Sequence, residues 1–390
     1  MDNDCLVNRL PVYLPTVEVE AYEVRSRANQ AEARAIFNMF KDTGLEQLTG
    51  EHDAFISLSP QLDSVALLEG APKSRLILGY FDDYLPGEIH GETLSGVIQE
   101  GYRFALSDRL CQNGLLAMAP QAYAVRLDVT QYAPDELEQR ATQLRAEGCR
   151  LLATNVDTYD DFEFCKSLNF DFYQGVFLCK PARQKGDIAV NRLAMVHLLS
   201  KLQKPNIDMA ELEQVISQDV ALSYRLLRFS NSAATGLRRE VTSIGHALRM
   251  AGMDRIRVWA SALLLSSVDD KPKELMNTAF VRGKMCEGLA ALLKVPEKEP
   301  YMFTGFLSVL DALLDCPMAQ ALEELPLADE VRGALLAHEG RIGQALRCSI
   351  AYERAEWEDV QFYGLSSAQI RDTYLNALTW ARQLMAGLKA

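Results

Sequence analysis

The segment DFYQGVFLCKP, residues 171–181, gives the strongest indication of fold in this chain of 390 residues. Its aromatic and aliphatic side chains are typical of a buried strand, because such residues fit the pleated surface of a sheet. Lys180 and Pro181 mark the exit, since proline has no N–H group to donate to a neighbouring strand. We therefore expect the segment to be the last strand of a buried sheet.

Strand-like and helical segments alternate on the N-terminal side of this segment. An extended start at residues 11–19 precedes short apolar runs that predict strands at residues 54–58, 75–80, 103–106, 124–128 and 150–154. Helical spacing of apolar residues predicts helices at residues 27–41, 61–68, 93–99, 134–147 and 160–168. Repeated strand–helix units build a parallel sheet covered by helices, and eight of them close a barrel.

The length of this half limits the barrel that it can form. A complete barrel of the TIM type takes about 250 residues, whereas about 180 are present here. We therefore expect an α/β fold with an incomplete TIM-type barrel, in which some helices are missing or shortened.

The second half has the pattern of an all-α domain. A polar segment at residues 182–187 ends the first half, and from about residue 190 the apolar spacing is helical. Asp208, Ser243 and Asp254 stand where helix N-caps are expected. We expect an all-α bundle of about ten helices. The predicted boundaries are an α/β-barrel domain at residues 1–183, a linker at 184–189 and an all-α domain at 190–390.

Charge is distributed unevenly between the two halves. Residues 1–183 hold 28 acidic and 16 basic residues, whereas residues 184–390 hold 25 and 24, so the first half carries almost all of the net charge of −13. An acidic surface repels phosphate backbones, and binding of nucleic acid is therefore not expected. The contrast between the halves also favours two separate modules.

Nothing in the sequence indicates a membrane or an oxidising compartment. No apolar run approaches the ~18 residues that span a bilayer, and the N-terminus lacks the pattern of a secretory signal. The eight cysteines are scattered without a Cys-x-x-Cys pair, and the five histidines show no ligand spacing. We expect a cytoplasmic protein without disulfides, metal ions or any other cofactor.

Seven segments of the first half, in order, resemble EAL domains, which hydrolyse the bacterial messenger cyclic di-GMP. They are LPVY at residues 10–13 with AYEVR at 21–25, FISL at 55–58, LILG at 76–79, FALSD at 104–108, VRLD at 125–128, LATNVDT at 152–158 and the segment at 171–181. The resemblance covers nearly all of residues 5–183. It implies a TIM-type barrel in which oxygen ligands hold Mg²⁺ or Mn²⁺ to activate water.

The residues that would hold these metal ions are mostly replaced. Glu23 matches the glutamate of the family's first strand, but the remaining ligand positions hold residues without a carboxylate, namely Ser57, Gly79, Ser107 and Thr154. Arg126 stands in place of the catalytic lysine, and a guanidinium group cannot accept a proton at neutral pH. Asp108, Asp128 and Gln174 remain at vestigial positions, and we interpret the carboxylates as ordinary hydrogen-bonded groups. The resemblance therefore predicts no phosphodiesterase activity.

The second half resembles the HDOD family, a helical relative of the HD phosphohydrolases that lacks their metal site. The resemblance extends over about residues 190–382, and its clearest motifs are VISQDVALSYRLLRFSNS at residues 215–232 and SIGHAL at 243–248. Catalytic relatives have a metal-binding His-Asp dyad where this chain has Ser308 and Val309. We interpret Asp311 as a capping or paired carboxylate, and we expect this half to be non-catalytic too.

A basic run in the second half has two interpretations. It consists of Arg225, Arg228, Arg238, Arg239, Arg249, Arg255 and Arg257, with only Glu240 and Asp254 to balance it. It is either a surface for phosphate or an acidic partner, including the acidic first half, or a set of solvated helix faces with local ion pairs.

The two resemblances predict a bacterial signalling protein with a degenerate EAL-like barrel and an HDOD bundle. It would not be an enzyme, and it would act through contacts with protein partners in cyclic di-GMP control. Two alternatives stay open: a cyclic di-GMP phosphodiesterase with residual activity, and a metal-free receptor for cyclic di-GMP. Arg25 and Arg126 are candidates for binding the dinucleotide, but an acidic domain without metal ions disfavours it, and cyclic di-GMP is not expected as a ligand.

Overall fold

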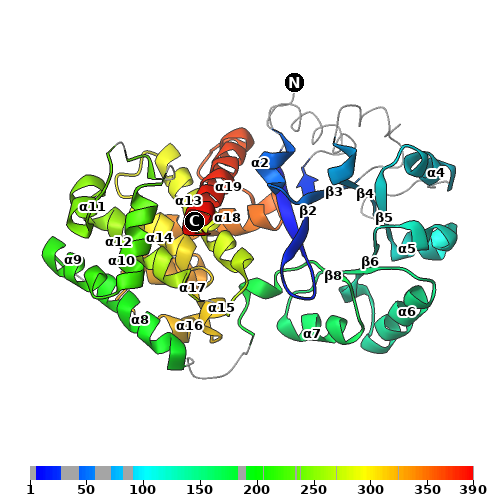
Figure 1. The fold of residues 1–390 in the computed structure, drawn as a ribbon, viewed down its shortest axis with the longest axis horizontal. Coiled ribbons are helices and arrows are strands. Elements are labelled where there is room, and N and C mark those ends of the chain that lie inside the picture. Colours follow the sequence, from blue (N-terminus) through cyan, green and yellow to red (C-terminus); the bar gives the residue numbers. More distant parts are fainter. Residues whose placement is uncertain are drawn as a thin grey trace. The chain divides into compact units, whose positions relative to one another are not determined.

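The chain forms two compact units, seen in a computed structural model (Figure 1). The described residues are 6–27, 44–57, 72–81, 91–182, 190–204, 206–232, 235–237, 239–268, 270–323 and 325–389. One unit comprises Met1–Phe177 with Glu353–Trp357, and the other comprises Leu178–Tyr352 with Glu358–Ala390. The predicted linker at residues 184–189 lies outside the described residues, and the predicted domain boundaries stay a prediction.

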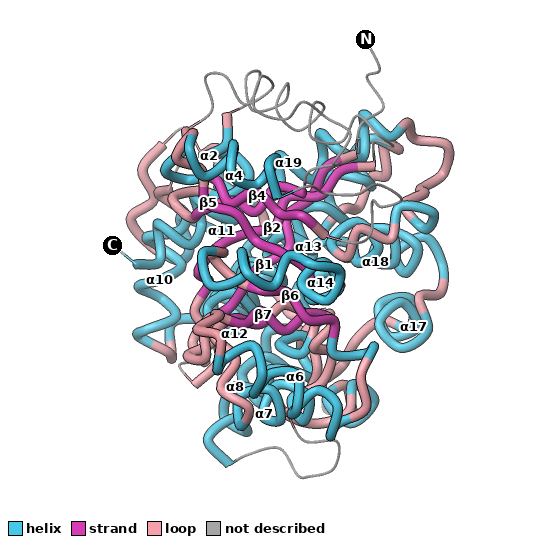
Figure 2. Tube along the Cα trace, turned by 90° about the vertical axis from the view of Figure 1, so that its right-hand side faces the viewer, coloured by secondary structure: helices cyan, strands magenta, loops and turns pink. Residues whose placement is uncertain are grey.

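Eight strands close a barrel in the first unit. They are β1 (Val7–Tyr13), β2 (Val19–Ser26), β3 (Asp53–Ser57), β4 (Leu76–Tyr80), β5 (Arg103–Ser107), β6 (Val125–Asp128), β7 (Leu151–Thr154) and β8 (Phe172–Tyr173). Strands β2 to β8 are parallel and paired in chain order, and Figure 2 shows the strands in magenta. Strand β1 is antiparallel to both of its neighbours, β2 and β8.

The prediction of an incomplete barrel is wrong, because the ring of strands is closed. Short connections explain how so few residues suffice. The described connecting helices are α2 (Leu45–Thr49), α4 (Gly91–Gln99), α6 (Pro134–Ala146) and α7 (Tyr159–Ser167), and Figure 1 shows α4, α6 and α7 on the outer side of the strands. Between β5 and β6 the chain forms only the short elements α5 (Asp108–Leu110), η3 (Cys111–Leu115) and η4 (Leu116–Gln121).

The predicted strands from residue 54 to residue 154 agree with β3 to β7 to within one residue at either end. Of the extended start predicted at residues 11–19, residues 11–13 belong to β1 and residue 19 begins β2, whereas residues 14–18 between them form a hairpin turn. Leu14 N donates to Glu18 O at 2.9 Å, and Val17 has a φ of 60°, which reverses the chain. The helices predicted at residues 27–41 and 61–68 fall, except for Arg27, outside the described residues.

The last strand is shorter than residues 171–181 predict. After the two residues of β8 the chain bends into a 3-10 helix, η6 (Phe177–Cys179). Val156 N donates to Gln174 O at 3.1 Å and Phe177 N donates to Val156 O at 3.3 Å, so the segment binds the loop after β7. A Cβ at Gly175 would overlap the backbone of Val156, and glycine therefore permits this crossing.

The second unit is all-α in its described part, as predicted. Its helices are α8 (Val190–Leu202), α9 (Met209–Ser217), α10 (Val220–Ser230), α11 (Ile244–Ala251), α12 (Met253–Leu265), α13 (Lys273–Leu292), α14 (Glu299–Leu307), α15 (Leu310–Leu314), α16 (Met318–Ala321), α17 (Asp329–Ala337), α18 (Gly340–Glu353) and α19 (Ser367–Lys389). Asp208 and Ser243 are N-caps, whereas Asp254 lies inside the first turn of α12, which follows Gly252.

Helices α13 and α14 approach each other most closely at two glycines. A Cβ at Gly305 would overlap the backbone of Gly283, so the helix backbones touch without intervening side chains. Phe306 packs beside this crossing, with its ring centroid 5.7 Å from that of Phe280 and 6.4 Å from that of Trp380. This close contact fixes the position of Ser308 at the end of α14. None of the described helices is both long and apolar enough to cross a membrane.

Candidate functional site

Seven of the positions singled out in the first half lie together at one end of the barrel. The interior of the barrel is filled by Ala21, Phe55, Ile77, Ala105, Ala124, Leu152 and Phe172. Side chains alternate between the two faces of a strand, so residues two places later face the same interior one layer higher. Those residues are Glu23, Ser57, Gly79, Ser107, Arg126, Thr154 and Gln174, which we call the strand-end ring. Because β2 to β8 are parallel, the ring lies at their carboxyl ends, where TIM barrels place active sites.

Glu23 is the charged centre of the strand-end ring, and its side chain is buried. Arg25 Nη2 lies 3.1 Å from Oε2 of Glu23, and Arg126 Nη1 lies 3.7 Å from Oε1. Burial disfavours the charged form, but attraction to Arg25 and Arg126, with a hydrogen bond from Arg25, lowers the pKa of Glu23 to about 2. The carboxylate is therefore ionised at neutral pH and already shared between two guanidinium groups.

Gly79 leaves no vacant space for a missing side chain. A Cβ at position 79 would overlap the ring of Phe81, which lies two residues later on the same face and is 3% exposed. The guanidinium carbon of Arg126 lies 4.5 Å from the centroid of the Phe81 ring, a cation–π arrangement. Phe81 therefore fills the place beside Gly79 and supports Arg126.

Three hydroxyl groups take the other positions of the ring. Ser107 Oγ accepts a hydrogen bond from Leu110 N at 3.3 Å and so caps α5. Thr154 Oγ1 donates to Leu127 O at 3.3 Å and accepts from Arg126 Nε at 3.4 Å. Ser57, Ser107 and Thr154 are all buried. Neutral hydroxyls can bind a phosphate oxygen, but they are poorer ligands than carboxylates for a hard divalent cation.

Asp108 and Asp128 form hydrogen bonds outside the strand-end ring. Asp108 is buried outside the strand-end ring and binds Arg140, with Nε at 2.7 Å from Oδ1, and the Tyr132 hydroxyl at 2.6 Å from Oδ2. It thereby attaches α6 to the end of β5. Asp128 Oδ1 accepts from the Thr130 N–H and hydroxyl groups, at 3.0 and 2.7 Å, as the cap of the short helix η5 (Val129–Gln131).

The ring does not fit the pair of divalent cations that the EAL resemblance implies. Mg²⁺ and Mn²⁺ need several hard oxygen ligands, and carboxylates usually supply them. Here one carboxylate faces two arginines, and the place beside Gly79 is filled by an aromatic ring. Within the described part of the chain no group of three or more His, Cys, Asp or Glu residues is arranged to hold a metal ion. What the ring offers is guanidinium, hydroxyl and amide donors.

The corresponding position in the helical unit is filled by packing. Ser308 ends α14, Val309 precedes α15 and is fully buried, and Asp311 lies in the first turn of α15. The buried Arg282 of α13 donates to Ser308 Oγ at 3.2 Å. Burial raises the pKa of Asp311 to about 6, although the Ala312 N–H group and Arg282 oppose the shift. No metal-binding dyad exists at Ser308 and Val309.

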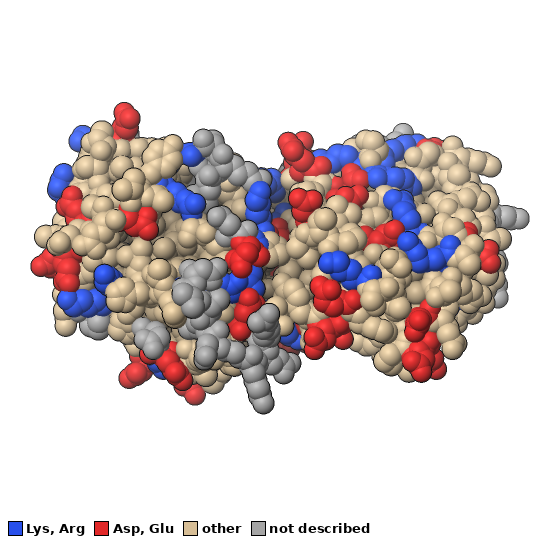
Figure 3. Space-filling model, turned by 60° about the horizontal axis from the view of Figure 1, so that its bottom comes forward, with Lys and Arg blue, Asp and Glu red and all other residues tan. Residues whose placement is uncertain are grey.

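The basic run of the helical unit is partly engaged in local contacts. Arg257 Nη1 lies 3.9 Å from Asp254 Oδ1, and the Arg228 guanidinium carbon lies 5.6 Å from the Tyr224 ring centroid. Arg238 lies outside the described residues. Figure 3 shows one face of the molecule, on which both basic and acidic side chains are exposed.

Sequence reasoning missed three residues that shape these sites. Phe81 has a local signal, since it directly follows the predicted strand at residues 75–80 and lies two places after Gly79, so it is expected on the same face as Gly79. Arg282 also has one, as an arginine within the apolar run AFVRGKM of a predicted helix. Arg140 has none, because only the packing of α6 brings it to Asp108, 32 positions earlier in the chain.

Comparisons with known proteins support both resemblances. Residues 192–353 match the family model of the HDOD domain. Cyclic di-GMP phosphodiesterase CdgJ of Vibrio cholerae is 28% identical over 376 residues, which cover 94% of this chain and 87% of that protein. The uncharacterized protein YuxH of Bacillus subtilis is 27% identical over 403 residues, which cover 97% of this chain and 98% of that protein.

Solved structures are also similar to part of the chain. A standalone EAL protein from Vibrio cholerae, in a cyclic di-GMP-bound form, aligns with a TM-score of 0.36 and 13% identity, covering 47% of this chain and 93% of that one. A PaMucR phosphodiesterase in complex with cyclic di-GMP aligns with a TM-score of 0.36 and 15% identity, covering 44% of this chain and 94% of that one.

One sequence-based prediction is overturned by these comparisons. The replaced metal ligands predict that the chain is not an enzyme. That prediction is wrong: a relative that matches 94% of the chain is named as a cyclic di-GMP phosphodiesterase. Replacement of these four ligand positions is thus an insufficient reason to conclude that the chain is not an enzyme.

Proposed function

We propose that this chain, an EAL–HDOD fusion protein, serves cyclic di-GMP signalling by binding the dinucleotide at the strand-end ring of its barrel. The observation that carries the proposal is the convergence of Arg25 and Arg126 at the carboxyl ends of parallel strands. Guanidinium groups bind phosphate oxygens with charge-assisted, often bidentate hydrogen bonds. Cyclic di-GMP carries two phosphodiesters, so two arginines match its charge.

The surroundings of the two arginines support this assignment. The side chain of Arg126 is 11% exposed and that of Arg25 is 26% exposed, so both lie where water is largely excluded and electrostatic attraction is strong. The hydroxyls of Ser57, Ser107 and Thr154 face the same interior and provide neutral hydrogen-bonding groups for the remaining oxygens. Glu23 holds the arginines in place until an anion competes for them.

Because the ring does not fit divalent cations, binding is assigned to these side chains alone. The expectation that cyclic di-GMP is not a ligand rests on the acidic balance of the whole first half together with the absence of metal ions. Local charge decides binding, since charges more than about 10 Å away are screened at physiological salt. Around Glu23, Arg126 of the ring and Arg25 next to it outnumber the one carboxylate that they share.

Hydrolysis of the bound dinucleotide is the second candidate function. It is favoured by the similarity to a protein named as a cyclic di-GMP phosphodiesterase over 94% of this chain. Arg126, which replaces the lysine of the family, would stabilise negative charge on the phosphodiester, but it would not accept a proton from water. Any hydrolysis therefore needs a proton acceptor other than Arg126.

The test measures binding and turnover on the same samples. Isothermal titration calorimetry of the full chain with cyclic di-GMP is expected to show saturable binding. Arg126→Met should weaken binding at least tenfold, because a charge-assisted hydrogen bond contributes about 1.5–3 kcal/mol. Chromatography of each sample after incubation with Mn²⁺ would show linear dinucleotide if the second candidate is right.

The matched control is Arg145→Met. Arg145 lies near the end of α6 and pairs with Asp171 beside the start of β8, so it belongs to the amino ends of the strands. This variant should bind cyclic di-GMP as tightly as the wild type. Absence of binding by the wild type, or equal losses in the two variants, would contradict the proposal.

A further inference from the structure

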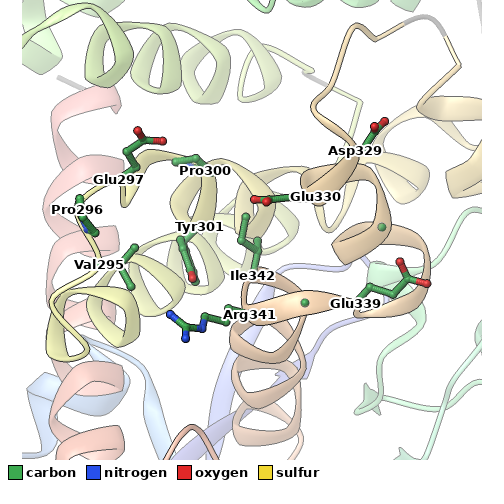
Figure 4. Close-up of a pocket in the computed structure, with 12 residues that line it drawn as sticks. Val295, Pro296, Glu297, Pro300, Tyr301, Asp329, Glu330, Glu339, Arg341 and Ile342 are labelled. Atoms are coloured by element: carbon green, nitrogen blue, oxygen red, sulfur yellow. The ribbon is translucent and has the colours of Figure 1, made fainter.

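A groove in the helical unit has no role in the barrel chemistry. It has a volume of about 640 Å³ and lies between the start of α14, the start of α17 and the start of α18 (Figure 4). Its residues come from three segments, 295–301, 329–333 and 339–342. All three belong to the HDOD match at residues 192–353. The groove is large enough for a few side chains of another molecule.

The floor of the groove is apolar and rigid. Tyr301 and Ile342 are buried beneath it, at 5% and 7% exposure. Pro296 and Pro300 border it, and Pro300 stands in the first turn of α14, where its fixed φ suits a helix start. A preformed floor of this kind requires little ordering when a ligand binds, so a larger share of its contact energy appears as affinity.

The rim of the groove is acidic. Glu297, Asp329, Glu330 and Glu339 line it, against the single cation Arg341. All four carboxylate residues are exposed, and none of the ion pairs found in the described residues involves them. Arg341 lies with its guanidinium carbon 5.6 Å from the Tyr363 ring centroid. Figure 4 shows the Glu330 side chain directed across the groove, and Arg341 extending past Tyr301 toward Val295.

Charge and shape together select the occupant. An anion such as a nucleotide is repelled by four carboxylates. A metal ion lacks a site, since no three carboxylate, Cys or His groups of the described residues are arranged to bind one. A chain with a basic side chain next to an apolar one matches both the rim and the floor, because the cation meets the carboxylates while the apolar group is buried.

We propose that this groove binds a short peptide segment of a partner protein, with a Lys or Arg facing Glu297 and Glu330 and an apolar residue on Tyr301 and Ile342. The proposal does not depend on cyclic di-GMP binding, because the groove and the strand-end ring belong to different units. It gives the HDOD domain a recognition surface with a defined chemical preference.

The experiment selects ligands from a random pool, so it does not require the partner to be identified first. Phage-displayed random heptapeptides are panned against the immobilised full chain, the double variant Glu297→Lys with Glu330→Lys, and the control Glu323→Lys. Glu323 is exposed in the same unit and does not line the groove. The wild type and the control are expected to enrich sequences with Lys or Arg within two positions of Leu, Ile or Phe, whereas the double variant should not.

A synthetic peptide of the most enriched sequence then gives the affinity by fluorescence anisotropy. The double variant should bind it at least tenfold more weakly than the wild type, and the uncharged variant Glu330→Gln should show a smaller loss. Unchanged thermal unfolding confirms that the double variant is folded. Failure to enrich any sequence, enrichment without basic residues, or equal affinity for the double variant would overturn the proposal.

Discussion

Two carboxylates, one in each unit, both lie near an arginine, yet their pKa values shift in opposite directions. Glu23 in the barrel and Asp311 in the helical unit are both shielded from water and near arginines, yet the pKa of Glu23 is lowered to about 2 and that of Asp311 is raised to about 6. The difference lies in the hydrogen bonds. Arg25 donates directly to Glu23, whereas Arg282 donates to Ser308 and leaves Asp311 with little more than the Ala312 N–H group.

The contrast distinguishes the strand-end ring, where charged side chains pair with one another, from the region around Ser308 and Asp311, where close helix packing dominates. In the strand-end ring Glu23 is paired with arginines, and the proposed anionic ligand would take its place as their partner. In the helical unit, the guanidinium group of Arg282 is hydrogen-bonded to Ser308 at the end of α14. It lies next to the contact between the backbones of α13 and α14 at Gly283 and Gly305. The EAL and HDOD resemblances imply replaced metal ligands in both units, and in the barrel the charged groups of Glu23 and Arg126 face each other across 3.7 Å. Four substitutions test this contrast.

The largest expected effect is in the packed site, from Gly305→Ala. The added Cβ would overlap the backbone of Gly283, which cannot move without separating α13 from α14. We expect a loss of about 3 kcal/mol or more in unfolding free energy. Urea denaturation followed by tryptophan fluorescence measures it, because Trp259 and Trp380 lie in the helical unit. Gly96→Ala is the control, since a Cβ there meets nothing within 4 Å, and a similar loss in it would refute this explanation.

Next is Glu23→Gln, which removes the charge and leaves two arginines facing a neutral amide. A pKa lowered from 4.5 to about 2 corresponds to roughly 3 kcal/mol of stability. Because the folded pKa lies below the unfolded one, this stability is complete above pH 4.5 and is lost as the pH falls toward 2. Urea denaturation followed by circular dichroism should show a difference at pH 7 that narrows at pH 3. A constant difference would indicate packing instead of charge.

Asp311→Asn should change the free energy of unfolding in the opposite direction to Glu23→Gln. The pKa of Asp311 is raised from 3.8 to about 6, so the folded state binds a proton more tightly than the unfolded state, and the charged form is destabilising at neutral pH. We expect the variant to be more stable by about 2 kcal/mol at pH 7, after allowance for partial exposure. The gain should shrink as the pH falls from 6 to below 4. A destabilised variant at pH 7 would remove the contrast with Glu23.

The smallest effect is expected for Gly79→Ala, where the obstacle is a side chain that can move. The new Cβ would meet the Phe81 ring, and we expect a loss of about 1–2 kcal/mol. Phe81→Leu opens this space. The double variant should therefore lose less unfolding free energy than the sum of the losses in the two single variants. A double-mutant cycle in urea measures the coupling. Strict additivity would show that Phe81 does not occupy the place beside Gly79.

The sequence predicted most strands of the barrel because each is a short apolar run bounded by turn residues. Glu23, Arg126 and Thr154 could be placed on one face by alternation along such strands. The full closure of the barrel could not be predicted, since it depends on how short the connections between strands are. An example is the connection between β5 and β6, where short helical segments from Asp108 to Gln121 replace a full helix. The short length of β8 could not be predicted either. The strand ends because the chain at Gly175 packs against the backbone of Val156, which lies in the loop after β7.

The candidate site was predicted in position but not in contacts. The replaced metal ligands that the EAL resemblance implies can be named residue by residue, as at Ser57 and Gly79. Whether the place beside Gly79 is empty depends on Phe81, and whether Asp108 is available depends on Arg140, which only the packing of α6 reveals. Function was harder still, because the loss of ligands suggested an inactive protein while a full-length relative is named as a phosphodiesterase.

The central claim is that arginine side chains, and not metal ions, hold cyclic di-GMP in the strand-end ring. Calorimetric titration of the full chain with cyclic di-GMP, in excess EDTA and in excess Mg²⁺, tests it most directly. We predict dissociation constants that agree within about twofold, since no charge-assisted hydrogen bond from Arg126 depends on a metal ion. Binding in Mg²⁺ that disappears in EDTA would contradict the claim.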